Sequence, residues 1–349
     1  MITALRSDTN STFKIKVVGI GGAGGNIVQR LYLEGLKCET IILNTDMQAL
    51  ARQRAHYLIP IGRNVTRGGG AGADPDLGRK AAEESIHEIL NKIENADLLI
   101  VVAGLGNGTG TGASPVVVRY AREKNILTVG VFTLPFEFES KKKVAIKAIE
   151  DMEKNLNTMI IIDNNMISEV VSLESKVREA YGIVDEVVKN CVESIISVIQ
   201  DYSEINVDFN DLKAIITRGG LGYFSKGVAE KPEDIQKAIY NVLSNPLLSG
   251  VSIQDVKGAL VNVKTNGELK MSSFTKIMND IRSAIPQNAG IKYGLLKEGD
   301  KTVKNYAEIY FIGTTGKGNE ADTITRITAR THSFKGNLDI PPGVRKHKK

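Results

Sequence analysis

Residues 104–112 read GLGNGTGTG, directly after the apolar run 98–103. Glycine allows the backbone to turn tightly and to approach a ligand closely. A glycine loop between a strand and a helix also directs backbone N–H groups toward an anion. Two further glycine loops, at 19–25 and 68–73, occur in the same half of the chain. Three such loops predict a cradle for a polyphosphate, because two helix N-termini can face one charge.

Apolar runs of strand length alternate with segments of helical spacing around these loops. The expected strands are 14–20, 40–43, 57–61, 97–103, 126–133 and 159–162. This alternation predicts an α/β fold with a doubly wound parallel sheet. Paired apolar residues from 177 to 201 predict one long central helix that is buried around most of its circumference. After residue 208, alternating helices and strands predict a second, smaller α+β domain.

The composition bounds the class of protein. The chain has 349 residues, 42% apolar and 24% charged, which suits about two domains with buried cores. No apolar run reaches the roughly 18–20 residues of a membrane helix. The N-terminal segment has no signal-peptide core, and two cysteines make no disulfide framework. These features predict a cytoplasmic protein.

The net charge of +5 is concentrated at the end of the chain. Residues 317–349 carry eight Lys or Arg against three Asp or Glu, so the rest of the chain is neutral. A neutral globular part lacks the basic surface that nucleic acids require. We therefore expect no nucleic-acid partner.

The 19–25 loop also fits the G-x-G-x-x-G fingerprint of an NAD(P)-binding Rossmann oxidoreductase, with Asp46 about twenty residues further on. A dinucleotide fold needs only one glycine loop, however, and none of the four histidines has an obvious catalytic setting. The sequence also has no G-x-x-x-x-G-K-[ST] motif, which would supply a phosphate-binding lysine. Backbone donors, the hydroxyls of Thr109 and Thr111, and Mg²⁺ would then neutralise the phosphates.

Several motifs resemble, in order, those of the tubulin/FtsZ superfamily. Residues 104–112 resemble its G-x-G-G-G-T-G-T-G signature, and 44–50 resemble N-T-D-x-Q-A-L. Residues 71–75 resemble A-G-A-N-P, and 206–211 resemble the N-x-D-F-x-D loop of the FtsZ branch. The resemblance covers roughly residues 14–313. It implies a GTP-binding domain joined by the central helix to a smaller domain, and a prokaryotic division GTPase rather than a tubulin.

The resemblance implies a guanine-nucleotide site, with GTP or GDP as ligand and Mg²⁺ as cofactor. Mg²⁺ would be held mainly by the phosphates, and no side chain is assigned to it. Lys143 stands where the family usually has an arginine; lysine keeps the charge but not the bidentate fork. The residues implied for the phosphates and their loops are Gly21, Gly22, Asn26, Asn44, Gly70, Ala71, Gly72, Ala73, Gly104, Gly106, Asn107, Gly108, Thr109, Gly110, Thr111 and Gly112.

A second group of residues is implied for the ribose and the base. Pro135 and Glu139 match the two ends of a P-F-x-F-E motif, which places Glu139 against the ribose. Asn164 aligns with the asparagine of the base loop, and Tyr181 stands where a phenylalanine usually stacks on guanine. Asp185, four residues later, offers a carboxylate that accepts from guanine N1–H and N2–H₂ together.

The resemblance assigns catalysis to Asp208 and Asp211, which position and polarise the attacking water, with Asn206 supporting their loop. About twenty residues separate Asp185 from Asp208, roughly 30 Å of helix. The carboxylates are therefore expected to act on the GTP of another copy of this chain, in a head-to-tail filament. Two alternatives stay open: the carboxylates cap the next helix, or the protein is a non-hydrolysing nucleotide-regulated scaffold.

The chain is expected to have five parts: a flexible N-terminal extension (1–13), a GTP-binding domain (14–176), the central helix and linker (177–205), an activation domain (206–316) and a basic tail (317–349). Residues 338–345 of the tail partially match D-I-P-x-F-L-R, a peptide that docks on membrane-tethering adaptors in bacterial relatives. The tail is therefore expected either to bind such an adaptor or acidic lipid or to be a solvated end without a partner. The first of these implies a location at the division site, on the inner face of the membrane.

Overall fold

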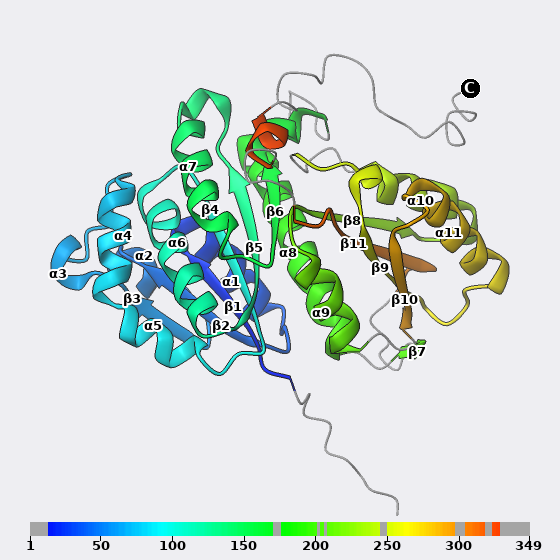
Figure 1. The fold of residues 1–349 in the computed structure, drawn as a ribbon, viewed down its shortest axis with the longest axis horizontal. Coiled ribbons are helices and arrows are strands. Elements are labelled where there is room, and N and C mark those ends of the chain that lie inside the picture. The colour runs from blue at the N-terminus through cyan, green and yellow to red at the C-terminus, as the bar shows by residue number, and fades with distance from the viewer. Residues whose placement is uncertain are drawn as a thin grey trace, which may run out of the picture.

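The computed structural model describes residues 13–169, 176–200, 203–205, 208–244, 250–296, 304–317 and 323–328. They form two sheets with the long helix α8 (Val177–Gln200) between them (Figure 1). The first sheet is parallel throughout, with strand order β3-β2-β1-β4-β5-β6. Its strands are β1 (Ile15–Ile20), β2 (Glu39–Asn44), β3 (Tyr57–Pro60), β4 (Leu98–Gly104), β5 (Leu127–Leu134) and β6 (Thr158–Asp163).

Helices connect these strands, as parallel pairing requires. The expected α/β fold with a doubly wound sheet is confirmed, and the strand order changes direction between β1 and β4. In such sheets, ligands bind at the carboxyl ends of the strands beside this reversal. The helices are α1 (Gly21–Leu33), α2 (Met47–Ala51), α3 (Arg63–Thr66), α4 (Pro75–Glu84), α5 (Ile86–Ile93), α6 (Gly108–Glu123) and α7 (Lys142–Glu153).

The second sheet is mixed and has five strands in the order β7-β10-β9-β11-β8. Helices α10 (Ile235–Leu243) and α11 (Met271–Ala284) lie on its far side from α8, and α9 (Phe209–Arg218) lies between the two sheets (Figure 1). The expected smaller second domain is therefore present. Its strands are β7 (Ser203–Ile205), β8 (Gly222–Ala229), β9 (Gly258–Lys264), β10 (Gly290–Leu296) and β11 (Ala307–Thr314).

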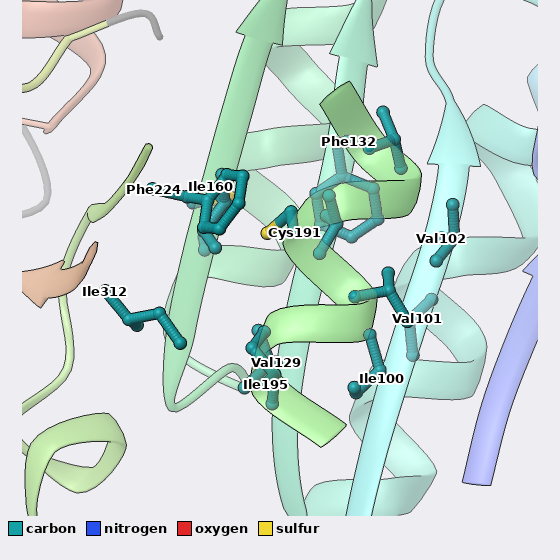
Figure 2. Close-up of a cluster of buried hydrophobic side chains, with 14 of the residues drawn as sticks. Ile100, Val101, Val102, Val129, Phe132, Ile160, Cys191, Ile195, Phe224 and Ile312 are labelled. Carbon is teal, nitrogen blue, oxygen red and sulfur yellow. The ribbon is translucent and has the colours of Figure 1, made fainter. Parts of the chain in front are cut away.

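Helix α8 runs antiparallel to the strands of the first sheet. Figure 2 shows Cys191 of α8 near the level of Phe132 in β5, and Ile195, one turn later, near Val129, which precedes Phe132 in the strand. All four side chains are buried in one continuous core that also includes Phe224 of the second sheet. The helix therefore begins toward the carboxyl edge of the first sheet and ends toward its amino edge. Cys191 is a core residue, and burial raises the pKa of its thiol.

The structure refines two expectations about the chain. Residues 203–205 form β7, which pairs with β10, so the second sheet begins inside the segment expected to be a linker. The basic tail contains a helical turn at 323–328, in which Ile327 is fully buried. Between β3 and β4, helices α4 and α5 follow one another and meet at Ser85. In the described ranges, no helix has the length and apolar character needed to cross a membrane.

Candidate functional site

Two glycine loops meet at the carboxyl edge of the first sheet. β1 and β4 are parallel neighbours, so the loops that follow Ile20 and Gly104 start side by side. A Cβ atom on Gly21 would lie 3.1 Å from the backbone nitrogen of Gly110, and one on Gly110 would lie 2.5 Å from the carbonyl oxygen of Gly104. Gly21 also has a φ of +74°, which favours glycine. The N-termini of α1 and α6 therefore converge, which makes an anion-binding site.

The glycine loop at 68–73 and the residues that follow it pack against the N-terminus of α6. A Cβ atom on Gly108 would lie 2.7 Å from the Cβ of Ala71, and one on Gly112 would lie 1.9 Å from the carbonyl oxygen of Pro75. Only glycine at these positions lets α4 and α6 approach so closely. Gly72 and Ala73 both adopt positive φ values, of +55° and +65°. All three glycine loops thus border one cradle.

Hydroxyl groups fix the loops to one another. Thr45 and Thr109 are joined by a hydrogen bond of 2.7 Å between their Oγ1 atoms. The backbone N–H of Gly106 donates to Thr111 Oγ1 at 2.8 Å, so this buried hydroxyl shapes the loop from inside. Asn44 is also buried, and its Oδ1 accepts from the N–H of Asp46 at 3.2 Å. Asn44 and Thr111 therefore hold loops in place.

The other residues predicted for the phosphates differ in exposure. Gly22 is exposed, and a Cβ atom there would meet no other atom within 4 Å. Asn26 is exposed on α1, and its Oδ1 accepts from Gln53 Nε2 at 3.1 Å. Gly70 donates its N–H to the carbonyl oxygen of Thr45 at 3.2 Å, which ties the third loop to the motif 44–50. The described contacts thus join the loops that carry the residues predicted for the phosphates.

Asn164 directly follows β6 and is 7% exposed, yet its Oδ1 makes no hydrogen bond with the described residues. Buried polar atoms are normally paired, so an unpaired one indicates a missing donor. The neighbouring Asn165 donates its N–H to Asp163 at 2.9 Å and accepts from the N–H of Glu137 at 2.7 Å. These contacts hold the loop after β5 against the loop after β6. Asn164 Oδ1 is therefore a buried acceptor that has no donor among the described residues.

An aromatic cluster lies beside this pair of loops. The ring of Phe136 stacks on Phe138 and meets Tyr181 edge-on, with centroids 5.1 Å apart in both cases. Phe138 is 77% exposed and Tyr181 is 41% exposed, which is unusual for large rings. Burial raises the pKa of Tyr181, and the negative charge of Glu139 adds to that shift. Glu139 and Tyr181, predicted for the ribose and the base, are thus close together.

Asp185 lies one helical turn after Tyr181 and is half-buried. Burial raises the pKa of its carboxyl above the ordinary range, although the positive charge of Arg30 acts in the opposite direction. Arg30 of α1 is paired with Glu186, the residue after Asp185. The helix that carries the first phosphate loop is thereby tied to the helix that carries the predicted base-reading carboxylate.

The lysines that follow Glu139 differ in their contacts. Lys141 Nζ donates to Oδ1 of Asn107, in the glycine loop 104–112, at 2.5 Å. Lys142 Nζ lies 3.4 Å from Asp163 Oδ2. Lys143, predicted from the family pattern to contact phosphate, is exposed at the start of α7. Pro135 is buried, and its ring would lie 3.0 Å from a Cβ atom on Gly106.

The predicted catalytic carboxylates lie at the opposite edge of the first sheet. Phe209, next to Asp208, stacks on Phe13 with centroids 4.3 Å apart, and Phe13 lies just before the first residue of β1. The cradle follows the other end of β1, a strand about 20 Å long. Along α8, fifteen residues from Asp185 to Gln200 span about 22 Å in the same direction. The structure therefore does not bring the carboxylates and the cradle together within one chain.

Asp208 and Asp211 form a reciprocal cap at the start of α9. The N–H of Asp211 donates to Asp208 Oδ1 at 2.8 Å, and the N–H of Asp208 donates to Asp211 Oδ2 at 3.4 Å. Lys292 of β10 lies 2.8 Å from Asp211 Oδ1. The helix-capping alternative is thus confirmed, and Asp208 is an exposed residue. Asn206 lies outside the described residues.

Sequence reasoning did not single out several residues of the site. Thr45 lies inside the motif 44–50, and Phe136 and Phe138 lie inside P-F-x-F-E, so these motifs contained the signal. Nothing in the local sequence pairs Lys141 with Asn107, because 34 positions separate them. Within the described ranges, no three His, Cys, Asp or Glu side chains form a metal-binding cluster.

Comparisons with known proteins agree with this arrangement. A model described as "Tubulin/FtsZ family, GTPase domain" matches residues 14–172, and one described as "FtsZ family, C-terminal domain" matches 220–315. The chain belongs to the tubulin/FtsZ family. This FtsZ-family chain is 37% identical to the cell division protein FtsZ of Aquifex aeolicus over 288 residues, which cover 82% of this chain and 78% of the relative.

Solved structures extend the similarity to the fold. A structure described as "FtsZ dimer, empty (M. jannaschii)" superimposes with a TM-score of 0.82 at 34% identity, covering 90% of this chain and 92% of that one. CetZ2 from Haloferax volcanii has the same fold, with a TM-score of 0.71 at 16% identity over 91% and 99% of the two chains. The FtsZ-family chain is accordingly a guanine-nucleotide-binding GTPase of the cell-division class, and the oxidoreductase alternative is set aside.

The raised pKa of Asp185 predicts the effect of removing its charge. The folded state binds this proton more tightly than the unfolded state, so the ionised carboxylate destabilises the fold at neutral pH. Asp185→Asn should therefore raise the free energy of unfolding at pH 7 without ligand. That gain should disappear as the pH falls through the interval between the ordinary and raised pKa values. Urea unfolding at several pH values measures this. A lower free energy of unfolding for Asp185→Asn than for the wild type at pH 7 would contradict a raised pKa for Asp185.

Proposed function

We propose that the chain assembles head-to-tail into filaments and hydrolyses GTP at each subunit interface. The observation that carries this proposal is the position of Asp208 and Asp211 at the amino edge of the first sheet, beside Phe13, with the glycine cradle at the carboxyl edge. About 20 Å of strand separates the two edges. Carboxylates at one edge can reach a nucleotide only at the opposite edge of another subunit.

In this proposal the cradle binds the phosphates through the N-termini of α1 and α6 and the glycine-rich loop before α4. Tyr181 stacks on the guanine, and Asp185 accepts from its N1–H and N2–H₂ groups. The unpaired Oδ1 of Asn164 accepts a further donor from the nucleotide, and Glu139 meets the ribose. Guanine supplies the pair of donors that a carboxylate recognises, whereas adenine does not.

Mg²⁺ fits this donor set as a cation bound mainly by phosphate oxygens and water. Magnesium sites in nucleotide-binding proteins commonly use few protein ligands. Asp46 and Asp74 border the cradle, but each accepts from backbone N–H groups as the cap of a short helix. When bound, the ion supplies positive charge that offsets charge on the phosphoryl group.

Hydrolysis would use the carboxylates of the adjoining subunit. Asp208 and Asp211 orient and polarise a water molecule for in-line attack on the terminal phosphate, with Asn206 supporting their loop. A contact between two different faces of the same protein propagates without closing. The M. jannaschii relative, 34% identical, is described as an FtsZ dimer, which supports self-association of this chain.

The basic tail is proposed to recruit the filament to the inner face of the membrane at the division site. Its charge would bind acidic lipid or a membrane-tethering adaptor. The adaptor-like segment 338–345 lies outside the described residues. The proposed location is therefore supported by the sequence of the tail and by the family.

Assembly-dependent catalysis predicts that GTPase activity per subunit rises with protein concentration. Below a threshold concentration each chain is separate and lacks the partner's carboxylates. Above it, turnover per subunit should rise to a plateau as light scattering reports filaments. Phosphate release measured across a hundredfold range of concentration tests this. Activity strictly proportional to concentration down to the highest dilution would exclude a shared site.

Removing either carboxylate should separate binding from hydrolysis. Asp208→Asn keeps a good helix cap, and Asp211→Asn keeps an acceptor at the third helical position. Both variants should bind GTP within about twofold of the wild type and still form filaments. Their turnover should fall at least about a hundredfold, in line with loss of a positioned base. Glu233→Gln, an exposed carboxylate in the same domain, is the control. Near-normal phosphate release from both variants would contradict the proposed role.

A further inference from the structure

Asn107 is placed as the cap of α6 but does not act as one. It immediately precedes Gly108, the first residue of the helix, and asparagine is among the best capping residues. Its side chain nevertheless makes no capping hydrogen bond. Oδ1 instead accepts from Lys141 Nζ at 2.5 Å. Because the side chain is directed to the lysine, it leaves the first N–H groups of α6 for the cradle.

The backbone around Lys141 fixes this lysine at the loop. Its carbonyl oxygen accepts from the N–H of Ala145 at 3.1 Å, so it begins the hydrogen bonding of α7. Ser140, just before it, adopts a φ of +56°. A Cβ atom on Gly106 would lie 3.2 Å from the Cβ of Lys141, so the lysine packs directly on the glycine loop. The Lys141 side chain therefore contacts the glycine loop at both ends: its Cβ packs against Gly106, and its ammonium group binds Asn107.

The phosphates need a full positive charge at this point. The N-termini of α1 and α6 each contribute only about half a charge, and the sequence has no Walker lysine. Among the neighbouring lysines, Lys142 is paired with Asp163 and Lys143 is exposed. The ammonium group of Lys141 is already hydrogen-bonded to Asn107, the residue just before α6. A lysine ammonium binds phosphate as a point charge.

We propose that Lys141, positioned by Asn107, is a phosphate ligand of the bound nucleotide. This inference rests on the proposed GTP site and adds a residue to it. The ammonium group donates to Asn107 and to a phosphate oxygen at the same time, since it carries three N–H donors. Asn107, where the family pattern has glycine, thereby acts as a positioning residue for the lysine.

Nucleotide titrations of the full chain test the proposal. GTP, GDP and guanosine are titrated against the wild type, Lys141→Gln, Lys141→Arg and Asn107→Gly, with Lys147→Gln as the matched control. Lys147 is exposed on α7, about one turn beyond the loop, so it reports loss of a nearby charge alone. Thermal unfolding of each variant checks that the fold is retained.

Lys141→Gln should weaken GTP and GDP binding about tenfold and leave guanosine binding within twofold. Lys141→Arg should retain most of the affinity, and Asn107→Gly should show part of the loss. Equal GTP affinities for Lys141→Gln and Lys147→Gln would overturn the phosphate role, as would an equal loss for guanosine. Failure of the wild type to bind GTP would instead overturn the proposed function itself, and the inference with it.

Discussion

The parallel sheet places every strand's carboxyl end at one edge, and this constraint governs the rest of the molecule. The loops after β1 and β4 must lie together there, so their helices aim two N-termini at one point. Helix α8 then runs back toward the other edge, and the stack of Phe13 on Phe209 places the start of α9 beside the start of β1. The cradle and the carboxylates proposed for hydrolysis are thereby held apart on one continuous core.

The carboxyl edge contains several features that the fold alone does not explain. The unpaired Oδ1 of Asn164 and the desolvated carboxyl of Asp185 both cost stability in the free chain. The exposed ring of Phe138 is a further feature of this kind. In the proposed site, the nucleotide would contact the Asn164 amide, the Asp185 carboxylate and the aromatic rings together. The amino edge is different, because Asp208 and Asp211 satisfy each other's backbone donors and need no ligand to be stable there.

Local sequence was sufficient to predict the parts of the fold that depend on local pattern. The glycine loops, the apolar strands and α8 each have a clear period or composition, and the structure contains them. β7 was missed because three residues carry no period, and it exists only through pairing with β10. The bond between Lys141 and Asn107 and the stack of Phe13 on Phe209 depend on tertiary packing across 34 and 196 positions, so no local pattern could reveal them.

A mixing experiment tests the shared active site most directly. One chain carries Asp208→Asn and Asp211→Asn, with its cradle intact. The other carries Gly22→Phe; a Cβ atom at this position meets no other atom within 4 Å, and the ring is intended to block the cradle. Each protein alone should release little phosphate. Their mixture should recover substantial GTP turnover, because the carboxylates of the Gly22→Phe chain can then act on GTP in the cradle of the other chain. A mixture no more active than the sum of its separate components would contradict the account.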